Sequence, residues 1–180
     1  RILHKLDLQP KPKKKVYKPK PYQQMTYPGE RVQIDVKIVP RACKIGEAAS
    51  ERLVQYTAID EYSRLRYLKA YKEQSTYSSK DFLLSLIPYY LKRGIEIQCI
   101  QTDNGLEFTN RLSMHQTKKL TAFETTVQTL GIQLKFIRPY TPRHNGKVER
   151  SHREDQKRFY NDRRFYSFED FARRLAAWQT

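Results

Sequence analysis

Hydrophobic and polar positions alternate over residues 31–39, where Val32, Ile34, Val36 and Ile38 are separated by polar side chains. This period of two predicts a strand with one buried face. The apolar segments 53–60 and 64–71 follow, separated by a short polar stretch, and predict two more strands joined by a tight turn. We therefore expect the core to begin with an antiparallel meander of three strands.

The second part of the chain changes to helical patterns that are interrupted by short apolar runs. A helix is predicted over 75–94, and Pro88 is expected to kink or shorten its last turns. The pattern predicts further strands and helices, namely strands at 95–102 and 132–137 and helices at 117–131, 147–160 and 167–178. Strands that are reached through helical crossovers run parallel. The order therefore predicts an α/β fold whose mixed five-stranded sheet, three antiparallel strands plus two parallel ones, is flanked by helices.

The net charge of the chain limits the kinds of partner that it is expected to bind. Among 180 residues, 35 Lys+Arg stand against 19 Asp+Glu, a formal net charge of +16 that favours nucleic acid or an acidic membrane surface. Residues 1–29 are rich in Lys and Pro and are interpreted as a basic linker or arm, followed by a core at 30–180. No apolar run is long enough to cross a membrane. Cys43 and Cys99 lack the spacing of a zinc site or a disulfide framework, so a soluble, reducing setting is expected.

Three acidic residues occupy positions at which an acidic side chain calls for a functional explanation. Asp35 interrupts an apolar strand, Asp103 ends the fourth strand, and Glu149 lies near the start of a polar helix. If the first and fourth strands are neighbours, the helix can bring Glu149 to both aspartates. Converging carboxylates repel unless a cation neutralises them. Oxygen ligands without Cys or His select Mg²⁺ or Mn²⁺, and a pair of such ions serves phosphodiester chemistry.

The strings around these acids resemble a known family. IDVKIV with Asp35, TDNGLEF with Asp103 and PYTPRHNGKVERSHR with Glu149 are similar to the catalytic core of Asp-Asp-Glu transposases and retroviral-type integrases. The similarity is closest to bacterial insertion-sequence transposases of the IS3 and IS481 type and covers about residues 25–178. It implies an RNase H-like fold. It also implies that Asp35, Asp103 and Glu149 are the catalytic residues and hold two Mg²⁺, with Mn²⁺ as a substitute.

The resemblance further implies an activity and its partners. The expected protein is the fragment of a larger transposase, a Mg-dependent polynucleotidyl transferase that hydrolyses phosphodiesters at transposon ends and transfers the 3′-OH into target DNA. Double-stranded DNA is the expected partner, with a homo-oligomer on paired ends, no membrane and no small-molecule substrate. The expected localisation is the bacterial cytoplasm, associated with the nucleoid.

Residues around the carboxylates carry further expectations. The interval between Asp103 and Glu149 is longer than is usual in the family, so an enlarged loop is expected around 109–121. Glu107 is expected in solvent, and His152 is expected to contact phosphate or a DNA groove. Asp60 and Ser63 are expected to cap a hairpin turn. Basic side chains that enclose Glu149 are expected to contact DNA, although a charge run is more often a solvated face: Arg143, His144, Lys147, Arg150, Arg153 and Lys157.

Three other functions remain open from the sequence. A domesticated core could bind DNA without cutting it, but the intact carboxylates argue against this. An RNase H-type nuclease is disfavoured by the TPRHNGKVER string and the overall charge. A retroelement integrase core would differ mainly in its flanking domains.

Overall fold

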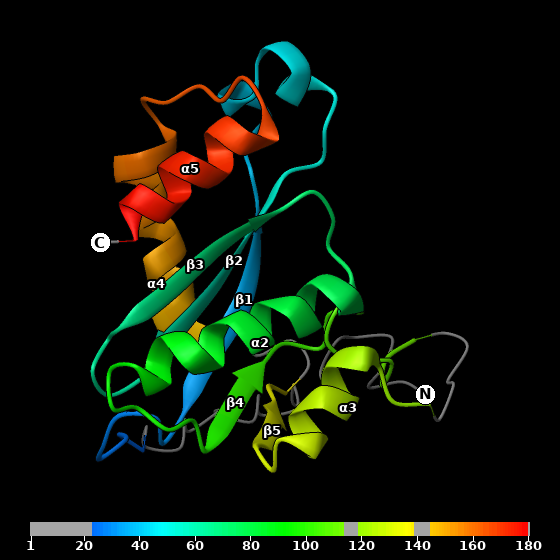
Figure 1. The fold of residues 1–180 in the computed structure, drawn as a ribbon, viewed down its shortest axis with the longest axis vertical. Helices are drawn as coiled ribbons and strands as arrows, with labels where there is room; N and C mark the ends of the chain where they lie inside the picture. The colour runs from blue at the N-terminus through cyan, green and yellow to red at the C-terminus, as the bar shows by residue number, and fades with distance from the viewer. Residues whose placement is uncertain (1–22, 114–118, 139–144, 180) are drawn as a thin grey trace, which may run out of the picture.

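The computed structural model describes residues 23–113, 119–138 and 145–179. A five-stranded sheet in the order β3-β2-β1-β4-β5 forms its centre (Figure 1). The first three strands are antiparallel neighbours, whereas β1 and β4, and β4 and β5, pair in parallel. This confirms the predicted mixed sheet. Its strands are β1 (Val32–Ile38), β2 (Val54–Asp60), β3 (Arg66–Tyr71), β4 (Cys99–Thr102) and β5 (Gln133–Phe136).

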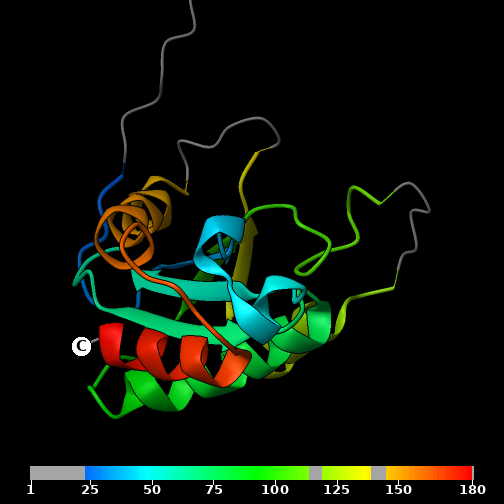
Figure 2. The ribbon, with the colours of Figure 1, turned by 90° about the horizontal axis from the view of Figure 1, so that it is seen from above.

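The alternation along β1 divides the molecule into two layers. Val32 and Ile34 are fully buried in the larger hydrophobic cluster. Gln33 lies on the other face, where its side chain meets α4 (Gly146–Asp155). Figure 2 shows α4 on one side of the sheet and α2 (Thr76–Leu91) on the other. A polar residue in a buried strand thus marks the face that receives a polar helix.

The helices α2 and α3 (Ala122–Thr129) pack against each other and contribute to the larger cluster. The side chain of Ser75 accepts the backbone N–H of Ser78 and begins α2, as predicted. The helix contains Pro88 and ends at Leu91. A capping box between Thr121 and Glu124 starts α3 at residue 122, five positions later than the sequence pattern indicates.

The polar helix α4 continues as a π-helical turn, Gln156–Tyr160, and is followed by α5 (Phe168–Trp178). Phe159, Tyr160, Phe171 and Leu175 are buried in a second cluster, which β3 also joins through Leu68 and Ala70. The apolar spacing of the last helix is therefore core spacing, as expected. Short 3₁₀ turns at Arg41–Cys43 and Gly46–Ala49 cross the end of this cluster and were not predicted.

The fourth strand is shorter than its apolar run. Residues 95–98 carry strand-like alternation, but their backbone groups have other partners: Ile95 N–H donates to the Tyr90 carbonyl and Gln98 N–H to the Gly29 carbonyl. Pairing with β1 is therefore left to the last residues of the run. Within the residues the structure describes, none of the helices has the length and apolarity needed to span a membrane.

Candidate active site

Strand register brings the two predicted aspartates together. In the parallel ladder between β1 and β4, Val32 lies beside Ile100 and Gln33 beside Gln101. Asp35 and Asp103 lie two residues beyond Gln33 and Gln101 in the sequence. Asp103 follows the last residue of β4, and its Oδ1 accepts the backbone N–H of Gly105 at 2.9 Å. The first two acids of the candidate site thus come from neighbouring strands.

The third acid lies on the first turn of α4, and this turn is fixed to β1. Gln33 Oε1 accepts the backbone N–H groups of Lys147 and Val148 at 3.1 and 3.2 Å, and Val148 is fully buried. Gln101, the neighbour of Gln33 in the ladder, donates to Asn145 Oδ1 at 3.3 Å. Glu149 follows directly on this anchored turn, half-buried, where the helix dipole favours an acid.

Charge accumulates around Asp35. Burial and the carboxylates of Asp103, Glu149 and Glu107 together raise the pKa of Asp35 to about 7, against the lowering effect of the hydrogen bond from the Val36 backbone N–H. Within the described residues, no lysine or arginine forms an ion pair with Asp35. The site therefore holds an excess of negative charge that a cation would relieve.

Glu107 is a fourth carboxylate of the site, which corrects the expectation that it is solvated. Only 8% of the residue is exposed. Gln74 Nε2 donates to its Oε1 at 2.7 Å, and burial raises its pKa. A Cβ on Gly105 would lie 2.5 Å from the Glu107 carboxylate. A side chain at the glycine of the Asn-Gly turn after Asp103 would therefore collide with the Glu107 carboxylate, whose charge helps to raise the pKa of Asp35.

The donor set fits a hard divalent cation by chemistry, because it consists of carboxylate oxygens with an unrelieved negative charge. The carboxylates of this set lie in the same region but do not converge on a single position. Across residues 23–113, 119–138 and 145–179, no group of three or more His, Cys, Asp or Glu side chains is arranged to hold a metal ion.

His152 also lies inside the site, and its expected contact with phosphate or a DNA groove stays a prediction. Its side chain is 13% exposed, with Nε2 3.0 Å from Thr57 Oγ1 and Nδ1 3.5 Å from Asp35 Oδ2. Burial, together with the charges of Lys37 and Arg66, lowers its pKa to about 4, although Asp155 raises it. The ring is therefore neutral at physiological pH and leaves the charge of Asp35 uncompensated.

Four of the six expected DNA contacts lie among the residues that the structure describes. Arg150, Arg153 and Lys157 are exposed on α4 and its π-helical extension, on positions that alternate with the buried Val148, Ser151 and Asp155. Lys147 is half-buried at the start of the helix. Arg143 and His144 lie outside the described residues. One face of the polar helix is therefore basic and free to meet a polyanion.

Arg64 joins this basic face, and the sequence pattern did not single it out. It occupies a positive φ of 67° in the β2–β3 turn. The turn is held by Asp60 Oδ2, which accepts the backbone N–H and the hydroxyl of Ser63, both at 2.6 Å. Burial lowers the pKa of Lys147, and the charge of Arg64 lowers it further. A strained residue that is held in place is a common mark of function.

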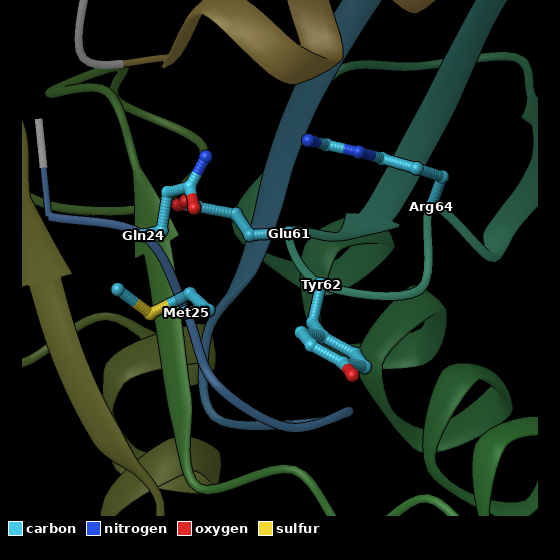
Figure 3. Close-up of a pocket in the computed structure, with 5 residues that line it drawn as sticks. All are labelled: Gln24, Met25, Glu61, Tyr62 and Arg64. Carbon is cyan, nitrogen blue, oxygen red and sulfur yellow. The ribbon is translucent and has the colours of Figure 1, made fainter.

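A shallow pocket of about 210 Å³ lies beside this turn. Figure 3 shows the Arg64 side chain extending from the turn toward α4, with Tyr62 below it. Arg31 and Gln33 both donate to Glu61, so the pocket backs onto the side chain that anchors α4. The pocket is lined by Gln24, Met25, Glu61, Tyr62 and Arg64.

Comparison with known proteins agrees with this architecture. The family described as integrase core domain matches residues 26–142, and a second family of the same description matches residues 130–180. No curated protein matches the chain.

Solved structures give the same fold. The chain is similar to an integrase chain in the intasome of simian T-cell lymphotropic virus bound to PP2A regulatory subunit B56 gamma, with 18% identity and a TM-score of 0.57 over 75% of this chain and 41% of that one. It is also similar to the catalytic core domain of BIV integrase (22% identity, TM-score 0.50, 72% of this chain and 68% of that one). The magnesium complex of the HTLV-2 integrase core gives 18% identity and a TM-score of 0.51, with 72% and 68% covered. The sheet and its helices therefore form the RNase H-like fold of integrase cores.

Proposed function

Because this chain belongs to the integrase core domain family, we propose that it is the catalytic core of a DNA transposase of the IS3 and IS481 type. Its activity would be phosphodiester hydrolysis at transposon ends, followed by attack of the freed 3′-OH on target DNA. The observation that carries the proposal is the parallel pairing of β1 and β4, which ends two residues before Asp35 and Asp103, together with the anchoring by Gln33 of the α4 turn that carries Glu149.

Asp35, Asp103 and Glu149 are the residues that would hold divalent ions, Mg²⁺ or Mn²⁺. Two such ions, when bound, supply activation of the attacking oxygen and charge stabilisation of the leaving one. The raised pKa of Asp35 supports this assignment, because an ionised cluster of this kind is costly without a counter-charge. The HTLV-2 core, a relative in fold, was solved in complex with magnesium.

The remaining residues of the site act by position. Gln33 holds the first turn of α4 and thereby sets the height of Glu149 above the sheet. Arg150, Arg153 and Lys157 present an exposed basic face that would contact phosphates, and Lys147 and Arg64 extend it. Arg143 and His144 remain predicted contacts of the same kind. Binding of paired ends by a homo-oligomer is proposed by analogy with the intasome of the simian virus.

The test is nicking of supercoiled plasmid in Mn²⁺ by the chain and by Glu149→Gln. We expect nicking that requires the metal and falls by at least about a hundredfold in the variant, since the amide removes a charged ligand. Arg93→Gln is the control, because Arg93 is exposed just beyond α2, and that helix lies on the other side of the sheet from α4 (Figure 2).

Equal nicking by wild type and Glu149→Gln would refute the site assignment. Binding of DNA by both proteins without nicking by either would favour a core that binds DNA but does not cut it.

A further inference from the structure

A buried chain of hydrogen bonds connects α4 to the sheet, and its first member is Asp155. This carboxylate is fully buried. Its Oδ1 accepts from Arg66 Nη1 at 2.6 Å and from Trp178 Nε1 at 2.7 Å, and its Oδ2 accepts from Gln55 Nε2 at 2.8 Å. Gln55 Oε1 accepts the Tyr160 hydroxyl at 2.6 Å. Since the Asp155 carboxylate is paired with Arg66 and accepts through both oxygens, the Gln55 amide has one orientation.

That orientation fixes the direction of the next bonds. Gln55 Nε2 also donates to Thr57 Oγ1 at 2.9 Å. Thr57 is fully buried, and the other side-chain partner of its hydroxyl within the described residues is His152 Nε2 at 3.0 Å. A buried hydroxyl hydrogen needs an acceptor. Thr57 therefore donates to Nε2 of His152.

The direction at Nε2 determines where the imidazole proton lies. A ring nitrogen that accepts a hydrogen bond carries no hydrogen itself, so a ring that accepts at Nε2 carries its hydrogen on Nδ1. Nδ1 is 3.5 Å from Asp35 Oδ2, while Asp35 Oδ1 accepts the Val36 backbone N–H at 2.9 Å. The separation at Oδ2 is longer than a strong hydrogen bond, so the N–H orients the carboxylate mainly by its dipole.

We propose that His152 is a positioning residue for Asp35, held in its Nδ1–H tautomer by Thr57, Gln55 and Asp155. The inference rests on the proposed function for its consequence, because it deepens the role of Asp35 as a metal ligand. A neutral donor orients the carboxylate without neutralising it, whereas a lysine or arginine at this place would compete with a cation. Loss of a residue that orients a metal ligand in this way typically lowers metal affinity or activity about 10–100-fold.

The tautomer is tested without metal or DNA. Two-dimensional ¹H–¹⁵N spectra through long-range couplings distinguish Nδ1–H from Nε2–H rings, and the His152 signals among the four histidines are assigned by their loss in His152→Asn. We expect the Nδ1–H form in the wild type and a shift to Nε2–H in Thr57→Val, which keeps the side-chain shape but has no hydroxyl. An Nε2–H ring in the wild type, or no change in Thr57→Val, would overturn the proposal.

The consequence for Asp35 is tested with two amides that mimic different ring nitrogens. The amide nitrogen of His152→Asn replaces Nδ1 and keeps a donor toward Asp35, whereas that of His152→Gln reaches the position of Nε2 near Thr57. We expect His152→Asn to keep Mn²⁺ affinity, measured by calorimetry, and nicking activity to within about threefold. His152→Gln should lose about 10–100-fold in both.

Thermal stability separates positioning from folding. Equal losses in both amide variants that follow their melting temperatures would mean that His152 is only a packing residue. A wild-type chain that neither binds Mn²⁺ nor nicks DNA would contradict the proposed function, while the tautomer measurement would still decide the hydrogen-bond chain.

Discussion

Gln33 in β1 accepts the backbone N–H of Lys147 in α4 at 3.1 Å, although the two residues are far apart in the sequence. The same side-chain oxygen also accepts from Val148, and the amide nitrogen donates to Glu61. A strand residue thus supplies the cap that α4 lacks from its own N-terminal residue, because Asn145 at the N-cap makes no side-chain cap hydrogen bond. This contact fixes the turn of α4 that carries Glu149.

Replacing Gln33 by Met should destabilise the protein by about 1–3 kcal/mol, because the backbone N–H groups of Lys147 and Val148 lose their acceptor and Glu61 loses one of its hydrogen bonds. Nicking should fall more than the fraction of folded protein, since Glu149 loses its anchor. Denaturant unfolding and the plasmid assay measure the two effects. Gln133→Met, at an exposed position of β5, is the matched control and should change neither. Unaltered stability in Gln33→Met would show that α4 is held by its other contacts.

The basic face of α4 should determine the salt dependence of DNA binding. In Arg150→Gln/Arg153→Gln, the slope of log affinity against log salt should decrease by about 2, because each phosphate contact contributes about 0.9. The control is Lys92→Gln/Arg93→Gln, which removes the same charge from exposed positions at the end of α2. Fluorescence anisotropy with a short duplex measures both. Equal slopes for the two double variants would mean that net charge, and not this face, binds DNA.

Asp35 should make the stability of the metal-free protein depend on pH. Its pKa is about 7 in the folded state and about 4 in an unfolded chain, so ionisation of Asp35 opposes folding. Relative to Asp35→Asn, the wild type should lose stability as the pH rises from about 4 to about 7, by up to about 4 kcal/mol since each pKa unit is about 1.4 kcal/mol. Unfolding in EDTA at several pH values measures this difference. Asp162→Asn, at an exposed position, should show no such trend.

Gly29 should tolerate no side chain. It has a φ of +84°, and a Cβ there would lie 2.0 Å from the Glu96 carbonyl oxygen. Gly29→Ala should therefore cost at least about 2 kcal/mol, because backbone strain adds to a movement of the 95–98 segment. Gly94→Ala has a similar φ of +71° but open space around the new Cβ, so its cost should be about 1 kcal/mol. Equal melting temperatures for the two variants would contradict the close approach.

The local sequence pattern predicted the helices and strands well where tertiary contacts do not change their ends. The alternation in 31–39, the Ser75 cap and the Ser167 cap each use neighbouring residues, and β1, α2 and α5 appear close to their predicted bounds. The boundaries were wrong where a distant partner intervenes. Residues 95–98 read as strand, yet Gly29 and Tyr90 engage their backbone.

The candidate site shows the same division. Asp35, Asp103 and Glu149 were predicted from their motifs, and their assignment as metal ligands stays a prediction. Glu107 was placed wrongly, because its burial depends on a contact with Gln74 that no local pattern encodes, and the contact of His152 with Thr57 was not predicted for the same reason.

The sequence by itself determined the element order, the basic character and the three acids, because periodicity, charge and motif are properties of neighbouring residues. Only the tertiary structure decided that Gln33 caps α4, that Arg64 joins the basic face, and that His152 faces Asp35. Each of these joins segments from different parts of the chain. Their geometry follows from how the strands and α4 pack, and packing is settled by the whole fold.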